Sequence, residues 1–269
     1  MTWLKNTFGT PHPIIGLLHL QSLPGDPFYT SENSIHGVIE SARRDLDALQ
    51  AGGVDGILIT NEFSLPYQKR VSPVTLASMG TVIGTLLSDI DTPFGVEAIY
   101  DGDATIELCA ATGASFTRCM FTGAWAGDLG IIDRDVSHTL RLKSALRLDD
   151  LKLFYFVTSE GEVYLNDRST PEIAESMIFN VRPDALVVGG SAAGQNPGPD
   201  ALAEVKNVSG DIPVVCGTGG KQSNVREILT AGDGAFVGTT FKRDGKFENP
   251  IDGARVSEFM SFVRSFRED

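Results

Sequence analysis

The 269-residue sequence predicts an α/β fold, a closed eight-stranded parallel (β/α)8 barrel of the TIM type with outer helices. Short apolar runs alternate with longer amphipathic segments, and eight such units follow one another from end to end. Several runs are apolar throughout, as are parallel strands that helices cover on both faces. The chain is also close to the ~250 residues typical of this barrel, so we expect residues 1–269 to form one domain.

The competing fold is a doubly wound open sheet, which the absence of a Gly-x-Gly-x-x-Gly motif after the first apolar run disfavours. The predicted strands are rich in Val, Ile, Leu and Phe. They are Ile14–His19, Asp55–Thr60, Phe94–Ile99, Ser115–Phe121, Leu151–Val157, Asp184–Gly189, Ile212–Gly217 and Ala235–Thr239. The predicted helices are Ser34–Gln50, Thr75–Ser88, Ala104–Thr112, Asp135–Leu146, Pro171–Asn180, Pro199–Val208, Asn224–Thr230 and Val256–Phe266.

Local signals support these elements. Thr170 precedes Pro171, and Asn224 stands three residues before Glu227, as expected where helices begin. A corner containing Gly or Pro recurs between a helix and the next strand. It reads Gly53–Gly56, Gly113–Ser115, Pro183–Ala185 and Gly232–Ala235. Repeated at the same place in successive units, this corner predicts the N-terminal rim of a barrel.

Composition narrows the class of function. The formal net charge of −13 opposes non-specific attraction to nucleic acid and to anionic lipid, so a small molecule is the expected partner. Three widely spaced cysteines form no CxxC pair, which argues against a disulfide framework or a zinc knuckle. No signal peptide and no run of ~20 apolar residues occurs, so neither export nor membrane insertion is expected. These features predict a cytoplasmic protein, with a homo-oligomer as a candidate assembly.

In this fold the C-terminal ends of the strands form the active face, and five ionisable or amide side chains fall there. His19, Asn61, Glu62, Glu97 and Arg118 end or follow the first four strands. Glu62 and Glu97 are candidate acid–base groups or ligands of a divalent metal ion, and His19 is a candidate metal ligand or proton carrier. In the alternative interpretation Glu62 caps a helix, Glu97 forms a buried ion pair with Arg118, and His19 is a structural hydrogen-bonding residue.

Glycine-rich loops follow the last three predicted strands. Converging backbone N–H groups, threonine hydroxyls and the helix N-terminus at Asn224 suit a phosphate group, which this fold often binds after strands seven and eight. The candidate phosphate-binding residues are Gly190, Ser191, Gly217, Thr218, Gly219, Gly220, Gly238 and Thr239. Lys242 or Arg243 could add a charged contact or point to solvent. In the alternative interpretation the glycines only fit tight corners of the barrel.

Several reaction types lack their residues. A Schiff-base aldolase needs a lysine in the mouth of the barrel, yet Lys152, the only strand lysine, starts its strand at the opposite end. Neither a P-loop nor a His-Glu-x-x-His or Gly-x-Ser-x-Gly motif is present. The long segment Phe121–Asp128 after the fourth strand is a candidate lid or interface, with an ordinary surface loop as the alternative.

Several motifs, in order, resemble the BtpA/SgcQ family over nearly the whole chain, with the SgcQ branch the more similar. They are Pro13–Leu20, Leu23–Pro27, Gly53–Gly56, Asn61–Tyr67, Ala111–Phe116, Phe121–Ala124 and Gly238–Gly245. The resemblance implies a TIM barrel and a link either to photosystem I biogenesis or, in the SgcQ branch, to sugar uptake and metabolism. It implies no particular reaction. Two positions depart from the family pattern: Glu97 replaces an Asn, and Val157–Gly161 lacks the His found in many members.

Two functions follow from these observations. The first is a cytoplasmic barrel enzyme that acts on a phosphorylated sugar or related small phosphometabolite, with Glu62, Glu97 and His19 near the reacting carbons. The second is a non-catalytic assembly or regulatory factor built on the same barrel. An enzyme needs converging ionisable groups in the mouth, whereas a scaffold needs an exposed apolar patch.

Overall fold

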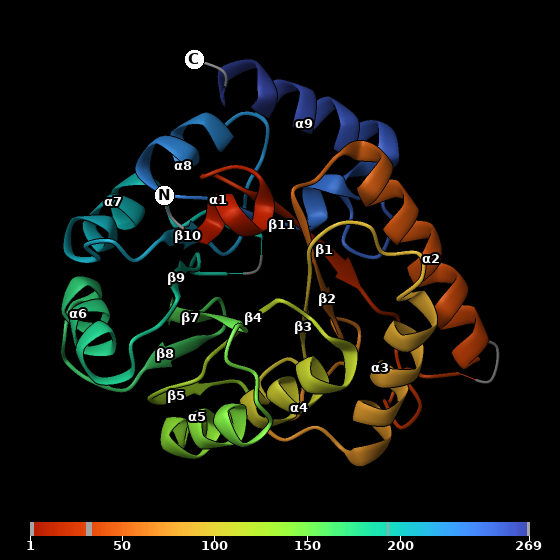
Figure 1. Cartoon of the computed structure of the whole chain (residues 1–269), viewed down its shortest axis with the longest axis horizontal. Coiled ribbons are helices and arrows are strands. Elements are labelled where there is room, and N and C mark those ends of the chain that lie inside the picture. The colour runs from red at the N-terminus through yellow and green to blue at the C-terminus, as the bar shows by residue number, and fades with distance from the viewer. Residues whose placement is uncertain (1–2, 31–33, 193, 268–269) are drawn as a thin grey trace.

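The computed structural model describes residues 3–30, 34–192 and 194–267 and confirms the closed eight-stranded parallel barrel (Figure 1). Each barrel strand pairs with the next one along the chain, and β11 returns to β1. The barrel strands are β1 (Ile14–His19), β2 (Gly56–Thr60), β3 (Phe94–Glu97), β4 (Phe116–Cys119), β7 (Lys152–Thr158), β9 (Ala185–Val188), β10 (Val214–Cys216) and β11 (Ala235–Val237). Each of these eight strands begins within two residues of the start predicted from the sequence.

Burial explains why these short runs form strands. Every residue of β1, β2, β9, β10 and β11 is buried, as expected where strands are covered from inside and outside. The barrel interior is filled by aromatic and aliphatic side chains that include Ile15, Phe116, Phe154 and Phe236. A larger apolar cluster lies between the strands and the surrounding helices. The interior is therefore a packed core, and space for a ligand is confined to its ends.

Within the described residues, eight helices surround the barrel, and Figure 1 shows them forming its outer ring. They are α2 (Ile35–Gly52), α3 (Pro73–Leu86), α4 (Gly102–Thr112), α5 (Val136–Ala145), α6 (Thr170–Val181), α7 (Pro199–Val208), α8 (Val225–Ala231) and α9 (Gly253–Arg267). Ser169 and Glu172 form a capping box at the start of α6. Gly53 and Gly113 end α2 and α4 with φ values of 80° and 73°, a conformation that favours glycine. No helix in the described ranges is long and apolar enough to cross a membrane.

Three of the four repeated corners contain an aspartate that fixes the start of the preceding strand. In three units the Oδ2 atom of this aspartate accepts a hydrogen bond from a backbone N–H of that strand, at 2.7–3.0 Å. The pairs are Asp55 with Ile14, Asp184 with Leu153, and Asp233 with Val214. Each aspartate also binds a basic side chain, namely Arg267, Lys152 and Lys206 respectively. The N-terminal rim is thus held by charge-assisted hydrogen bonds.

A short helix that the sequence analysis did not predict, α1 (Trp3–Phe8), covers the N-terminal end of the barrel (Figure 1). Leu4 and Phe8 are buried in the interior cluster, and the ring of Phe8 lies edge-on to that of Phe116, with centroids 5.2 Å apart. The indole nitrogen of Trp3 donates to the backbone oxygen of Asp184. This helix closes the N-terminal end of the barrel, so the barrel opens at the C-terminal ends of its strands.

The segment Phe121–Asp128, predicted as a lid or interface with an ordinary surface loop as the alternative, contributes one strand to a small antiparallel sheet. Its strands are β5 (Ala124–Gly127), β6 (Gly130–Asp133) and β8 (Glu162–Tyr164), in the order β6-β5-β8. Trp125 is 1 % exposed and packs edge-on against Tyr164, which anchors one face of the sheet. Because β5 and β6 follow β4 while β8 follows β7, the sheet ties together two loops on the C-terminal side of the barrel.

Candidate active site

A cavity of about 820 Å³ lies among the loops that follow the barrel strands. One side of the cavity carries the acidic residues Glu62 and Glu160, and the other side is formed by the glycine-rich loops after β10 and β11. Among the lining residues are His19, Glu62, Arg118, Glu160, the segment Gly217–Ser223, Gly238, Thr239, Thr240, Phe247 and Arg255. Most of the predicted site residues therefore meet in one place, although Asn61, Glu97, Gly190 and Ser191 are not among those that line it.

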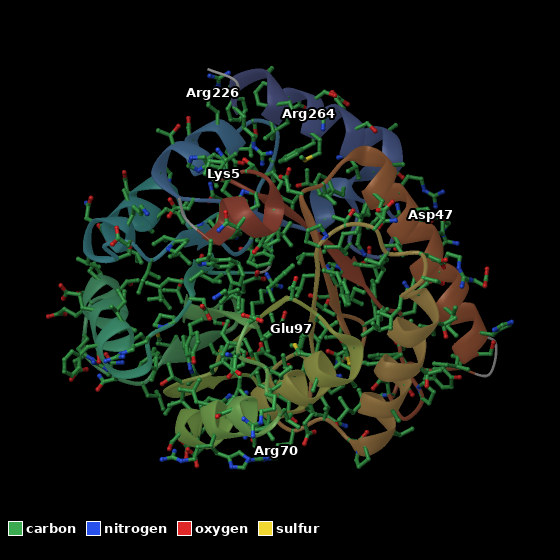
Figure 2. The ribbon with its side chains drawn as sticks, viewed as in Figure 1. Lys5, Asp47, Arg70, Glu97, Arg226 and Arg264 are labelled. Carbon is green, nitrogen blue, oxygen red and sulfur yellow. The ribbon has the colours of Figure 1, made fainter. Side chains whose placement is uncertain are left out.

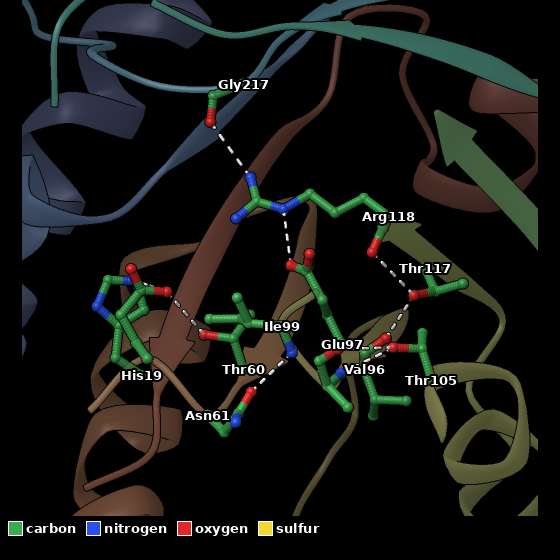
Figure 3. A network of polar contacts seen from close by, with 12 residues as sticks. His19, Thr60, Asn61, Val96, Glu97, Ile99, Thr105, Thr117, Arg118 and Gly217 are labelled. Atoms are coloured by element: carbon green, nitrogen blue, oxygen red, sulfur yellow. Dashed lines mark hydrogen bonds and ion pairs between the residues drawn. The ribbon is translucent and has the colours of Figure 1, made fainter. Parts of the chain in front are cut away.

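Arg118 lines the cavity and is held by three contacts, two of which are hydrogen bonds to Glu97 and Gly217 (Figure 3). Its Nε donates to Oε2 of Glu97 at 3.0 Å, and its Nη1 donates to the backbone oxygen of Gly217 at 3.2 Å. The guanidinium also lies over the ring of Phe236, 4.6 Å from its centroid. Nη2 has no hydrogen-bond partner among the described residues and points to the side on which His19 lies (Figure 3).

Glu97 lies beneath Arg118, near the middle of the molecule (Figure 2), and is 4 % exposed. The ion pair that the sequence analysis left open is therefore present. Burial raises the pKa of Glu97 to about 7, while the charge and hydrogen bond of Arg118 act in the opposite direction. Since Glu97 reaches the cavity only through Arg118, its position is that of a residue that orients the guanidinium.

His19 and Glu62 face each other across the mouth, with Nε2 of the imidazole 3.9 Å from Oε2 of the carboxylate. Burial lowers the pKa of His19 to about 4, despite the opposing charge of Glu62, so the ring is neutral at physiological pH. Neither ring nitrogen has a hydrogen-bond partner among the described residues. Glu62 caps no helix: it accepts hydrogen bonds from the hydroxyls of Tyr67 and Thr60, at 3.2 and 3.3 Å.

Asn61 is 2 % exposed and has a structural contact. Its Oδ1 accepts a hydrogen bond from the backbone N–H of Ile99 at 2.8 Å (Figure 3). This bond ties the end of β2 to the loop that follows β3, and so fixes the backbone next to Glu62.

The glycine-rich loops divide into those that line the cavity and those that support it. The backbone N–H groups of Gly219 and Gly220 have no partner among the described residues and lie in the cavity wall. Gly190 lies outside it, where an added Cβ atom would be 2.0 Å from the backbone oxygen of Gln195. Ser191 is likewise outside, and its hydroxyl donates to the side chain of Gln195. The backbone oxygen of Gln195 in turn accepts a hydrogen bond from the hydroxyl of Thr218 at 2.8 Å, so the loop after β9 supports the loop after β10.

The two cations considered for phosphate lie elsewhere. Lys242 is 1 % exposed, and its Nζ donates to the backbone oxygen of Phe247 at 2.6 Å, outside the cavity lining. Arg243 is exposed and does not line the cavity either. Lys221 and Arg255 are the basic side chains of the glycine-rich wall. Lys152 pairs with Asp184 at the N-terminal rim, far from the mouth in the chain topology.

No set of three His, Cys, Asp or Glu side chains within the described ranges is arranged to hold a metal ion. Glu160, which the sequence analysis did not select, lines the cavity from the loop between β7 and β8. Its position directly after the fifth barrel strand was the available signal, because the same criterion selected Glu62 after the second.

Comparisons with known proteins agree with this fold. The chain is 44 % identical over 267 residues to the sgc region protein SgcQ of Escherichia coli (strain K12), covering 99 % of this chain and 100 % of the relative. It is 29 % identical over 260 residues to the photosystem I biogenesis protein BtpA of Synechocystis, covering 96 % and 90 %. A solved thiamine phosphate pyrophosphorylase from Pyrococcus furiosus superposes with a TM-score of 0.57 at 19 % identity, over 97 % and 98 % of the two chains. The BtpA family model matches residues 10–265, and the chain belongs to the BtpA family.

Proposed function

We propose that this protein is an enzyme that acts on a small phosphorylated sugar or a related phosphometabolite. The observation that carries the proposal is one cavity that is lined both by ionisable side chains and by backbone donors without a partner among the described residues. Gly219 and Gly220 contribute the N–H groups, and Glu62, Arg118 and neutral His19 contribute the groups for proton transfer and charge stabilisation. A volume of about 820 Å³ accommodates a ligand of this size.

The phosphate group would lie against the loops after β10 and β11. Two backbone N–H groups and the hydroxyl of Thr239 can donate to its oxygens, and Lys221 and Arg255 supply positive charge at the outer wall. The carbon skeleton would then extend towards Arg118, and Glu62 and His19 would exchange protons with it there. Glu97 contributes by holding Arg118 in position.

The activity is proposed for the cytoplasm, a reducing compartment, in keeping with three cysteines that are buried and free.

Calorimetry with sugars and their phosphates tests this assignment. We expect glucose 6-phosphate and fructose 6-phosphate to bind more tightly than glucose and fructose. Replacing Thr239 by Val removes one donor to a charged group, worth about 1.5–3 kcal/mol, and should weaken only the phosphates by roughly 10- to 100-fold. Thr85→Val on the exposed face of α3 is the matched control. Equal affinity for each sugar and its phosphate would contradict the proposal.

One observation favours the second function, a non-catalytic assembly factor. The outer face of the small sheet presents a cross-strand row of Ile131, Ala126 and Val163, in which Ile131 is 62 % and Val163 is 72 % exposed. An exposed apolar row of this kind suits a protein contact. If the protein is a scaffold, Val163→Lys impairs its function while Thr239→Val does not, and the reverse result supports the enzyme.

A further inference from the structure

Two carboxylates, Glu258 and Glu160, line the cavity without a hydrogen bond or ion pair to another described residue; Glu258 is exposed, which leaves Glu160 as the partly buried one. It lies in the short loop Ser159–Gly161, between β7 and β8, and is half-buried. The function proposed above uses Glu62 and Arg118 and gives Glu160 no task. A half-buried carboxyl group without a partner, in the wall of a ligand cavity, is a candidate for the chemistry there.

The loop that carries Glu160 is firmly held at both ends. At its start, the pairing of β7 with β9 shifts register between Phe156 and Thr158, an irregularity that redirects the side chains that follow. At its end, Glu162 accepts hydrogen bonds from the hydroxyls of Tyr100, at 2.5 Å, and Ser159, at 2.6 Å. Glu162 also belongs to β8, which pairs with β5. These contacts fix the backbone of the loop on both sides of Glu160.

Tyr100, whose hydroxyl helps to hold this loop through Glu162, has an unusual backbone conformation. Its φ value is 65°, a conformation that a residue with a bulky side chain adopts at an energetic cost. Tyr100 lies in the loop after β3, so its bond to Glu162 joins that loop to the loop after β7. Strain that is retained in order to make one specific contact is typical of functional sites.

The surroundings of Glu160 keep its proton exchangeable near neutral pH. Burial raises the pKa of Glu160 to about 7, the charge of Arg118 on β4 opposes this shift, and Glu62, Glu162 and Glu97 reinforce it. A carboxyl group with this pKa can both accept and return a proton under physiological conditions. Arg118 presents its free Nη2 to the same cavity, as described above.

We propose that Glu160 and Arg118 enolise a ketose phosphate bound in the cavity, Glu160 as the base and Arg118 as the donor to the substrate's carbonyl oxygen. The inference rests on the proposed function. Glu160 takes a proton from a carbon next to the carbonyl group, and the electron pair of the broken C–H bond forms a C=C bond. The carbonyl oxygen becomes an oxyanion, which Nη2 of Arg118 stabilises. Reprotonation by Glu160 regenerates the carboxylate, so the step needs no further reactant.

Hydrogen exchange in D2O tests this step directly. The wild-type protein is incubated with dihydroxyacetone phosphate and with fructose 6-phosphate, and NMR follows the loss of the proton signals on carbons next to the carbonyl group. We expect exchange that Glu160→Gln lowers by roughly 10²- to 10⁴-fold, the usual contribution of a general base. In the wild type the exchange rate should rise with pH through about 7 as Glu160 loses its proton.

Three controls separate the possible outcomes. Glu204→Gln, on the exposed surface of α7, should leave exchange unchanged, and Glu160→Asp, which keeps the carboxylate, should retain part of it. Glycerol 3-phosphate has no carbonyl group and reports phosphate binding alone, which should be equal in wild type and Glu160→Gln. If the ketose phosphates bind but do not exchange, or exchange equally in Glu160→Gln, this inference is wrong. If none of the three phosphates binds, the proposed function itself is wrong.

Discussion

Replacing Glu97 by Gln should make the protein more stable relative to the wild type as the pH rises from 5 to 8. Glu97 is 4 % exposed, and burial raises its pKa from 4.5 to about 7. Between these two values the native state keeps a proton that the unfolded chain has released, so wild-type stability falls as pH rises through this window. The variant has no such proton and does not show this loss.

The magnitude follows from the size of the shift. Each pKa unit corresponds to about 1.4 kcal/mol of unfolding free energy. Because the pKa of about 7 lies between pH 5 and pH 8, the wild type should lose about 2–3 kcal/mol of unfolding free energy relative to the variant across this range. Urea denaturation of both proteins at the two pH values measures it, since other titrating groups are common to both and cancel in the difference.

The opposite sign would refute this reasoning. If Glu97 is ionised throughout and acts as the permanent counter-charge of Arg118, its neutral substitute leaves the guanidinium, whose side chain is 8 % exposed, without that counter-charge. Breaking a buried pair in this way costs about 3–5 kcal/mol, and the loss would be present at pH 8. The two cases differ in direction, so experimental scatter cannot confuse them.

Two further predictions concern stability. The pKa of His19 is lowered from 6.5 to about 4, so the unfolded chain binds more protons than the native state in this interval and the wild type gains stability as the pH rises from 4 to 6.5. Urea denaturation should show that His19→Gln lacks this gain. An unchanged pH dependence would show that His19 is not buried as a neutral ring. Leu4 is 0 % exposed, so Leu4→Ala should cost about 2–5 kcal/mol and lower the melting temperature, whereas Lys5→Ala on the exposed side of the same helix should not; equal melting temperatures would mean that α1 does not close the barrel.

The eight barrel strands could be predicted because each is a short apolar run that alternates with an amphipathic segment of helical length. The helix α1 could not, since its six residues are too few to show a helical period and depend on packing against the barrel. The strands β5, β6 and β8 have three or four residues each and pair only with one another, so no local pattern marks them.

The sequence predicted where the candidate site lies on the barrel, but not which loop side chains line its cavity. Strand order indicated that Glu62, Arg118 and Gly219 would meet at the mouth, and they line one cavity. The sequence could not show that Ser191 lies outside the cavity lining or that Lys242 is buried against Phe247. Ser191 donates to Gln195, four residues away, and Lys242 donates to Phe247, five residues away, and these contacts within irregular loops follow no helical or strand period.

The aspartates at the N-terminal rim have a consequence for how this protein can change over evolutionary time. Asp55, Asp184 and Asp233 fix strand starts at the end of the barrel opposite the cavity, and α1 seals that end. Closure of the barrel is therefore independent of the loops in which a ligand would be recognised. The loops that line the cavity can therefore change in length and sequence without disturbing these strand starts, so new substrates can be acquired on an unaltered frame.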